Sequence, residues 1–100
     1  MRNIILLCAQ GMSTGVMVER MKAAAAKIGY ECTISAHPVA QAKALGSEAD
    51  VILLGPQVRF EKDAVQNQCP GKPVQVIDMA AYGRLQGDKV IAQVKAILGD

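Results

Sequence analysis

The chain has 100 residues, 11 of them Lys or Arg and 9 Asp or Glu, which gives a formal net charge of +2. A chain of this length is expected to form a single domain over residues 1–100. The small positive charge is spread over scattered basic residues, and aromatic residues make up only 3% of the chain, which argues against nucleic-acid binding.

The apolar segments are too short to span a membrane. Hydrophobic residues make up 51% of the chain, but the clean run near the N-terminus covers only residues 4–7, whereas a span needs about 18 or more. The N-terminus also lacks the apolar stretch and cleavage site of a signal peptide. Three cysteines without a C-x-x-C pair predict neither a disulfide framework nor a zinc site. We therefore expect a soluble cytoplasmic protein with no metal and no other cofactor.

Strand-like apolar runs alternate with helical patterns along the whole chain. In chain order the pattern predicts a strand over residues 3–8, a helix over 14–28, a strand over 31–36, a helix over 38–45, a strand over 50–54, a helix over 59–68, a strand over 74–77 and a helix over 88–98. Strands that are apolar throughout are buried on both faces, so the sheet should be parallel with helices on each side.

Local signals support the predicted helices. The first helix should end at Gly29, the second has Pro38 in its first turn, and the last has Asp88 as N-cap. The stripe of the first helix consists of Met17, Met21, Ala24, Ala25 and Ile28. The third helix has only a partial stripe, formed by Phe60, Ala64 and Val65. The buried face of the last helix is expected to hold Val90, Ile91, Val94, Ile97 and Leu98.

Right-handed crossovers between the strands give a small doubly wound sheet. Ligands of such sheets bind beyond the carboxyl ends of the strands. This rule directs attention to the loops at residues 8–15, 55–59 and 78–83.

The loop after the first strand combines a nucleophile with hydrogen-bond donors. Cys8 would face the N-terminus of the first helix, whose unpaired N–H groups and dipole favour a thiolate. Gly11 and Gly15 allow the backbone to curl, and Ser13 and Thr14 offer hydroxyl groups. Such a ring of donors suits a bound phosphoryl group. On spacing alone, a small hydrophobic core residue is an equally good interpretation of Cys8.

The loop differs from other phosphate-binding motifs. It matches neither G-x-x-x-x-G-K-[ST] nor G-x-G-x-x-G. A cysteine phosphatase would carry a phosphate-clamping arginine six residues after the cysteine, where this chain has Thr14. Without that arginine, the charge of the transition state for hydrolysis is less well stabilised. A phosphorylated cysteine could therefore persist until its phosphoryl group is transferred to another acceptor. Cys32 and Cys69 follow no glycine-rich loop and are expected to be structural.

Four segments in register resemble the IIB component of the bacterial phosphoenolpyruvate-dependent sugar phosphotransferase system, lactose/cellobiose/diacetylchitobiose branch. They are ILLC at residues 5–8, GMST at 11–14, VILLGPQV at 51–58, and KPVQVID at 72–78 with YG at 82–83. The resemblance implies a flavodoxin-like three-layer α/β sandwich, similar to low-molecular-weight tyrosine phosphatases, with a four-stranded parallel sheet in the order 2-1-3-4.

The resemblance also implies a mechanism. Cys8 would accept a phosphoryl group from a phosphohistidine of the IIA component and pass it to an incoming sugar of cellobiose, diacetylchitobiose or lactose type at the membrane IIC component. IIA and IIC would be separate chains, and IIC would be the only link to the membrane. The loop expected to hold the phosphoryl group comprises Ala9, Gln10, Gly11, Met12, Ser13, Thr14 and Gly15.

Four residues after the third and fourth strands could contact a partner or the phosphoryl group: Pro56, Gln57, Asp78 and Tyr82. The Gly-Pro turn that contains Pro56 should lie beside the cysteine loop, although a plain strand-ending turn is the simpler interpretation. Asp78 could be a general acid, but a helix cap or turn is preferred because a phosphocysteine relay has no leaving alcohol to protonate. His37 is expected to be a solvated loop residue.

Two other functions remain open on the residues alone. A small cysteine phosphatase or arsenate reductase could use the same loop, although Thr14 stands at the arginine position and no resolving cysteine lies nearby in sequence. A non-catalytic binding module on the same sheet would have an inert Cys8. The rate of thiol alkylation against pH separates this last class from the others.

Overall fold

The computed structural model describes residues 1–9 and 15–100. The expectations for Gln10, Gly11, Met12, Ser13 and Thr14 lie outside the described residues. In chain order the elements, with η for a 3₁₀ helix, are β1 (Arg2–Cys8), α1 (Gly15–Lys27), β2 (Cys32–Pro38), η1 (Val39–Gln41), α2 (Ala42–Leu45), η2 (Gly46–Glu48), β3 (Val51–Leu54), η3 (Pro56–Glu61), α3 (Lys62–Gln68), β4 (Val74–Val76), α4 (Met79–Gly83) and α5 (Gly87–Leu98).

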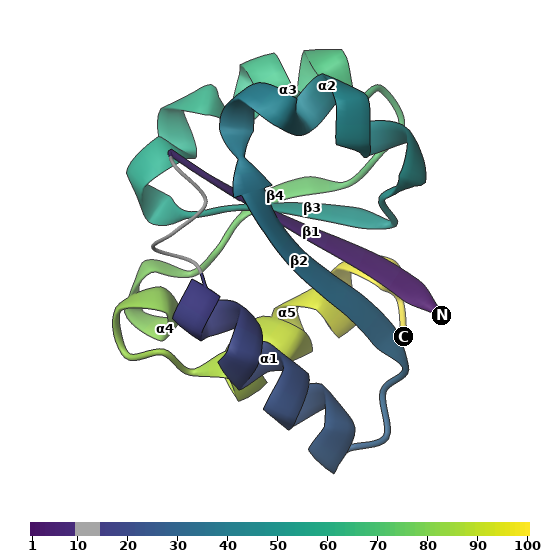
Figure 1. Ribbon diagram of the computed structural model, residues 1–100, viewed down its shortest axis with the longest axis vertical. Helices are drawn as coiled ribbons and strands as arrows, with labels where there is room; N and C mark the ends of the chain where they lie inside the picture. Colours follow the sequence, from purple (N-terminus) through teal and green to yellow (C-terminus); the bar gives the residue numbers. More distant parts are fainter. Residues whose placement is uncertain (10–14) are drawn as a thin grey trace.

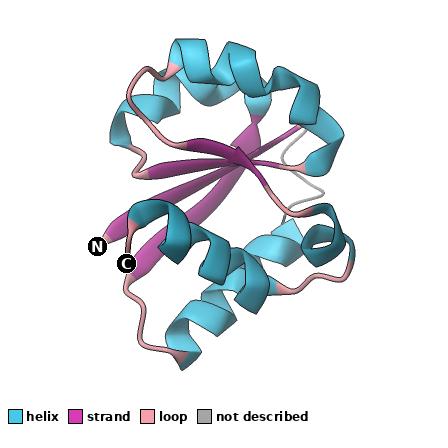
Figure 2. Ribbon diagram, turned by 180° about the vertical axis from the view of Figure 1, so that it is seen from behind, coloured by secondary structure: helices cyan, strands magenta, loops and turns pink. Residues whose placement is uncertain are grey.

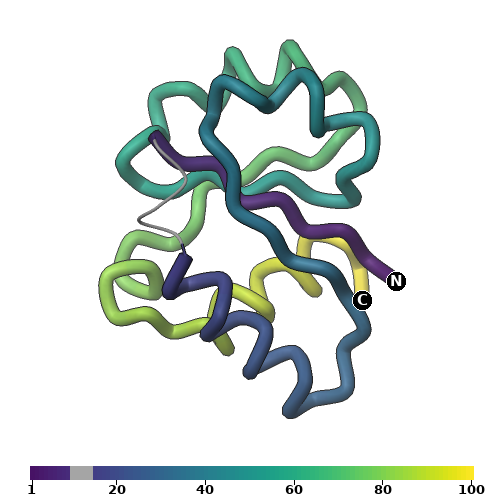
Figure 3. The backbone as a smooth tube through the Cα atoms, viewed as in Figure 1, coloured from purple at the N-terminus to yellow at the C-terminus, as the bar shows by residue number. Residues whose placement is uncertain are grey.

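Within the described residues, the four strands form one parallel sheet in the order β2-β1-β3-β4, which confirms the expected order. Helices α1, α4 and α5 cover one face and α2 and α3 cover the other (Figure 1, Figure 2). The three-layer α/β sandwich is therefore confirmed as well. Both ends of the chain lie at the edge of the sheet where the strands begin (Figure 3).

The sheet separates two hydrophobic cores, because successive strand residues point to opposite faces. In β1, Ile4 and Leu6 belong to the core under α1 and α5, whereas Ile5 and Leu7 belong to the core under α2 and α3. These four side chains are at most 5% exposed, and burying each one stabilises the fold by about 1.5–3 kcal/mol. Burial on both faces explains why the strands are apolar at every position.

Helix α1 buries most of its predicted stripe. Met17, Met21 and Ala25 are buried, and Val18 joins them. Ile28 was expected in the stripe but is exposed. The reason is that α1 ends at Lys27 and the chain reverses at Gly29, whose φ of 68° lies in the left-handed region.

The second predicted helix begins later than expected. Pro38 is not in its first turn but is the last residue of β2, where it pairs with Cys8 of β1. Proline is tolerated there because β2 is an outer strand and no ladder N–H is required. The remaining residues form the short sequence η1, α2 and η2 instead of one continuous helix.

The third predicted helix is divided into η3 and α3, and only one of its three stripe residues is buried. Val65 lies in the core, whereas Phe60 and Ala64 are exposed. Phe60 is in η3, which follows the end of β3 instead of lying along the sheet. Its exposure therefore results from its position at the rim.

The last helix confirms its predicted buried face but begins one residue earlier. Val90, Ile91 and Val94 are buried, while Ile97 and Leu98 are partly buried against the same core. The N-cap is Gln86, and Asp88 lies in the first turn, so the predicted N-cap is wrong. Helix α4 was not predicted, because five residues are too few to show a helical period.

Helices α1 and α5 approach each other closely at Gly87. A Cβ atom at this position would meet the backbone carbonyl carbon of Arg20 and would lie 2.7 Å from the backbone nitrogen of Met21. Only a residue without a side chain allows this contact between the two helices.

The outer strand β4 is bridged by a side chain from α5. Gln93 Nε2 donates to the carbonyl of Val76 at 3.0 Å, and Gln93 Oε1 accepts from the N–H of Asp78 at 3.4 Å. Ile77, between these two residues, donates its N–H to Leu54 of β3 at 2.9 Å. Gln93 therefore binds the side of β4 that points away from the sheet.

An ionic contact joins three segments at the edge where the strands begin. Arg2 donates to the carboxylate of Asp100 at 2.9 and 2.8 Å, and Tyr30 donates its hydroxyl at 2.6 Å. Arg2 is on β1, Tyr30 precedes β2, and Asp100 follows α5. The carboxylate therefore links the first strand to the last helix.

Candidate functional site at the carboxyl edge

The candidate site lies where the central strands end. Gly55 donates its backbone N–H to Leu7 at 2.9 Å, and Ile77 donates to Leu54 at 2.9 Å, so the ends of β1, β3 and β4 are aligned. The elements that follow these strands are α1, η3 and α4, and they gather at the same edge (Figure 1). This is the position at which doubly wound sheets bind ligands.

Cys8 is the last residue of β1 and has 0% exposed surface. Strand alternation places it on the same face as Ile4 and Leu6, the face covered by α1 and α5. Ala9, which follows it, is exposed. The end of β1 therefore holds an enclosed thiol next to the rim of the sheet.

The turn after β3 lies beside Cys8, as predicted. A Cβ atom on Gly55 would be 3.8 Å from the Cβ of Cys8 and 3.0 Å from the side-chain Oε1 of Gln57. Cys8 and the Gln57 amide are therefore both neighbours of Gly55. Pro56 is buried at the start of η3, whereas Gln57 is exposed. Arg59 Nη1 donates to the carbonyl of Pro56 at 3.1 Å, which holds its guanidinium against the turn.

Asp78 caps helix α4, in agreement with the preferred sequence interpretation. Its Oδ2 accepts from the N–H of Ala81 at 3.0 Å, and its carbonyl accepts from the N–H of Tyr82 at 2.9 Å. Tyr82 is half-buried and packs against the core under α1 and α5. The Asp78 carboxylate thus fixes the start of α4, and Tyr82 anchors that helix to the sheet.

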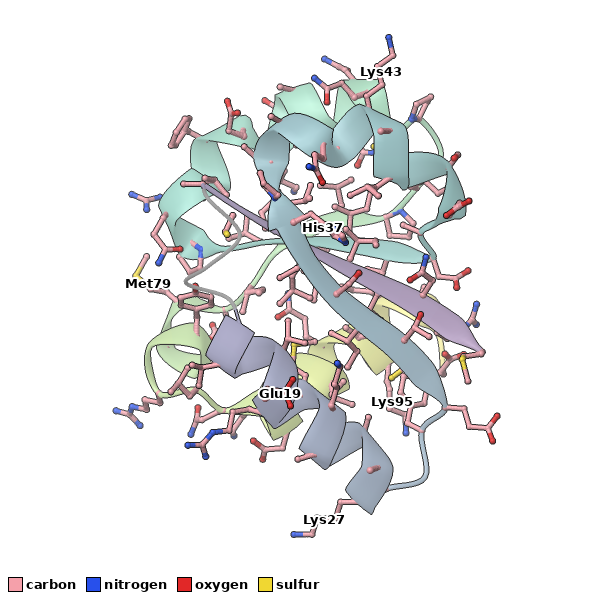
Figure 4. The ribbon with its side chains drawn as sticks, in the orientation of Figure 1. Glu19, Lys27, His37, Lys43, Met79 and Lys95 are labelled. Carbon is pink, nitrogen blue, oxygen red and sulfur yellow. The ribbon has the colours of Figure 1, made fainter. Side chains whose placement is uncertain are left out.

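His37 is not a solvated loop residue. It is half-buried in β2, next to Leu7 in the strand register, and its Nε2 lies 3.0 Å from the hydroxyl of Ser35 (Figure 4). The prediction was wrong because β2 continues two residues past position 36, to Pro38. Alternation places His37 on the face opposite Ile34, away from the core that contains Ile4 and Leu6.

The other two cysteines lie away from Cys8. Cys32 pairs with Arg2 at the beginning of the strands, roughly 20 Å from the end of β1 at the usual rise per residue. Cys69 lies in the core on the other face, and its Sγ donates to the carbonyl of Ala42 at 3.4 Å. Burial raises the pKa of both thiols. Both are therefore structural, as expected.

Within residues 1–9 and 15–100, no group of three or more His, Cys, Asp and Glu residues could hold a metal ion. No helix in the described part of the chain has the length and apolar character needed to cross a membrane.

The sequence alone did not identify Gln93 of α5, whose side chain accepts a hydrogen bond from the backbone N–H of Asp78. Its role depends on how α5 crosses β4, and no local pattern encodes that.

The sequence matches the family model described as PTS system, lactose/cellobiose-specific IIB subunit, over residues 3–93. It is 39% identical over 100 residues to the oligo-beta-mannoside-specific EIIB component of Bacillus subtilis (strain 168), covering 98% of this chain and 97% of that protein. It is 41% identical over 102 residues to the galactose-specific EIIB component of Lactococcus lactis subsp. cremoris (strain MG1363), covering 95% of this chain and 94% of that protein.

The fold is similar to those of solved IIB components. The solution structure of a cellobiose-specific phosphotransferase IIB component from Borrelia burgdorferi has a TM-score of 0.82 at 31% identity, covering 98% of this chain and 92% of that chain. A lactose-specific IIB domain from Streptococcus pneumoniae has a TM-score of 0.80 at 18% identity, covering 93% of each chain, and supports the fold alone. Sequence and fold agree that this chain belongs to the lactose/cellobiose-specific IIB subunit family of the sugar phosphotransferase system.

Proposed function

We propose that Cys8 is the phosphoryl carrier of this IIB component. The observation that carries the proposal is its position: Cys8 ends the central strand β1 at the carboxyl edge, beside the Gly55 turn and between the elements that follow the strands. The Cys8 thiolate would attack the phosphorus of a phosphohistidine on IIA. The S–P bond forms as the P–N bond breaks, and the imidazole leaves with the electron pair.

In the second step a sugar hydroxyl oxygen, presented at IIC, would attack the same phosphorus. An O–P bond forms, the S–P bond breaks, and the thiolate of Cys8 leaves while the hydroxyl proton is released. Phosphoryl transfer depends on positioning and charge stabilisation more than on acids or bases. A loop without ionisable side chains is therefore sufficient, and we assign the binding of the phosphoryl oxygens to residues 9–15, with hydroxyl groups from Ser13 and Thr14.

The sugar belongs to the lactose and cellobiose class in this proposal. The relatives named above are specific for an oligo-beta-mannoside and for galactose, and a third, from Lactococcus lactis subsp. lactis (strain IL1403), is specific for cellobiose. Because relatives of nearly equal identity differ in sugar, we assign the choice of sugar mainly to IIC. The proposal includes a cytoplasmic location, because both steps need partner proteins at the inner side of the membrane.

A cysteine phosphatase or arsenate reductase is not favoured. Thr14 stands where a phosphatase would have its arginine, and the carboxylate of Asp78 is engaged as a helix cap. A reductase needs a second thiol near the first, whereas Cys32 and Cys69 lie at the other end of the sheet and on its other face.

The proposal is tested by intact mass after incubation with phosphoenolpyruvate, the general phosphotransferase proteins and a IIA protein. Wild type and the matched control Cys32→Ser should each gain one phosphoryl group, and Cys8→Ser should gain none. If wild type gains none although IIA is demonstrably phosphorylated, alkylation decides the cause. A Cys8 that reacts well below the free-thiol pKa of about 8.5 indicates a mismatched IIA, whereas an inert Cys8 rejects the proposal.

A further inference from the structure

The outer edge of β2 lacks the usual protection of an outer strand. β2 is 7 residues long, contains no Lys, Arg, Asp or Glu, and has its proline at the last position. Outer strands are normally guarded by charged side chains, internal prolines, bulges, short length or a covering element. The opposite outer strand, β4, has only 3 residues and is bridged by Gln93. Figure 1 looks onto the β2 side, where this strand runs in front of the others.

The hydrogen bonds of the sheet show which backbone groups of β2 point outward. Arg2 donates its N–H to the carbonyl of Glu31, so the backbone of Glu31 faces β1. Successive residues of a strand direct their N–H and C=O groups to alternate sides, so Cys32, Ile34 and Ala36 face outward. Within residues 1–9 and 15–100, these outward groups have no hydrogen-bond partner. They form a row of free donors and acceptors.

Helix α1 flanks this edge without closing it. A cavity of about 190 Å³ lies between the helix and the side chains of Cys32 and Ile34. Lys22 lines the same cavity, and Glu19 lies 3.8 Å from its ammonium group and offsets its charge. The outer side of β2 therefore remains accessible to another strand.

We propose that β2 pairs with the β2 of a second copy of this chain, antiparallel and centred on Ile34, so that two sheets join into one. A two-fold axis at Ile34 uses the same surface of both copies. It places Ile34 opposite Ile34, Cys32 opposite Ala36, Thr33 opposite Ser35, and Glu31 opposite His37. The outward-facing residues then oppose one another, and each such pair exchanges two hydrogen bonds.

The side chains favour this register. Glu31 is exposed, and its carboxylate would accept a hydrogen bond from the imidazole of the opposing His37, which Figure 4 shows on β2. Thr33 would meet the hydroxyl of Ser35, and directly opposed pairs of these kinds stabilise antiparallel strands. Centring the axis on Ser35 instead would oppose Cys32 to Pro38, which has no N–H to donate.

The arrangement leaves the candidate site of each copy at its own edge. Antiparallel pairing puts the carboxyl ends of the two sets of strands on opposite edges of the joined sheet. The contact lies along β2 and uses none of the residues assigned to phosphoryl transfer. The inference therefore stands or falls independently of the proposed function.

Sedimentation velocity of the full chain, from about 10 μM to about 1 mM, tests the pairing. We expect the mass to rise from 10.6 kDa toward twice that value. The expected Kd is about 10–100 μM, because one strand pair with its flanking helices is a small interface. A chain that remains at 10.6 kDa up to about 1 mM overturns the proposal.

Variants test the strand edge and the register separately. Ala36→Pro removes an outward N–H that the sheet does not use, and it should raise Kd by at least about 10-fold. Glu31→Lys should raise Kd by about 3- to 10-fold, because the two-fold axis repeats the lost pair. Adding His37→Glu to Glu31→Lys should restore the affinity, since opposite charges face each other again. Asp63→Lys, an equal charge reversal on α3, should leave Kd unchanged.

Thermal unfolding verifies the fold of each variant, and Glu31→Lys alone tests the edge if Ala36→Pro does not fold. A dimer whose Kd is unchanged in the folded variants joins through another surface, which refutes pairing along β2. A folded double variant that stays as weak as Glu31→Lys refutes the register centred on Ile34.

Discussion

Gly87 sets the distance between α1 and α5, and replacing it with alanine should destabilise the fold. The added Cβ would lie 2.5 Å from the carbonyl oxygen of Arg20 and 2.7 Å from the nitrogen of Met21. Both atoms belong to the backbone of α1, so no side chain can rotate away to make room. Helix α5 must therefore move away from α1, and the core that they share must open.

The cost can be worked out from two opposing effects. Alanine is favoured over glycine by roughly 0.5–1 kcal/mol in the interior of a helix, and by less at its first residue, which is the position of Gly87 in α5. Overpacking that forces a backbone shift costs about 1–3 kcal/mol and occasionally more. Because the overlap involves the backbone of α1, which cannot rotate out of the way, overpacking should prevail, with a net loss of about 1–2 kcal/mol. For a domain of this size, that loss lowers Tm by roughly 4–16 °C.

The assay is urea unfolding followed by circular dichroism, with Gly83→Ala as the matched control. A Cβ on Gly83 meets nothing within 4 Å, so this variant should be neutral or up to about 1 kcal/mol more stable. A Gly87→Ala protein as stable as wild type would refute the argument. Equal destabilisation of both variants would do so too, since it would show a general intolerance of alanine.

Three further predictions concern other contacts. Asp78→Ala should lower the free energy of unfolding by about 0.5–2 kcal/mol through loss of the α4 cap, whereas Asp78→Asn should retain most of that stability. If Asp78 does not act as a general acid, the rate of phosphoryl transfer of Asp78→Asn should stay close to that of wild type. The hydrogen bond from Arg2, followed by that from Tyr30, lowers the pKa of Asp100 to about 2. The ionised carboxylate therefore stabilises the fold fully above the ordinary carboxyl pKa of about 3.9. This stabilisation is lost as the pH falls through the folded-state pKa of about 2. The urea midpoint of wild type should therefore drop more between about pH 4 and pH 2 than that of Asp100→Asn, and parallel curves would contradict this. The Cβ added by Gly46→Ala should overlap the Sγ of Cys69 and destabilise the fold. Cys69→Ala should restore part of the lost stability, with a coupling of about 0.5–3 kcal/mol in a double-mutant cycle. Strictly additive effects would show that the two sites do not interact.

The sequence was most informative for strands whose two faces are both buried. The run Ile4 to Leu7 is apolar at every position because both faces of β1 are covered. This property predicted a strand of a parallel sheet, whereas its place inside the sheet came from the strand order that the family resemblance implies. The expectation that the Gly55 turn lies beside Cys8 rested on the pairing of the first and third strands that the family resemblance implies, and the structure confirms this pairing.

The sequence was least informative where a residue's environment depends on distant segments. Phe60 looked like part of a buried stripe, but η3 lies at the rim of the sheet and leaves it exposed. Pro38 looked like the start of a helix, yet it completes an outer strand that requires no N–H there. Ile28 continued a correct periodicity one residue past the end of α1 at Lys27, just before the chain reverses at Gly29. In each case the local pattern was correct, but the sequence did not show which distant segments would surround the residue in the folded chain.

The bridge from Gln93 to β4 has a consequence for how this protein can associate. A fifth strand added at β4 would need the carbonyl of Val76 and the N–H of Asp78, and the amide of Gln93 already binds both. Unpaired outer strands are the usual template for aggregation and domain swapping. Here a single side chain occupies two of the backbone groups that a neighbouring strand would use, so another copy of the chain could pair with β4 at these positions only by displacing the Gln93 amide.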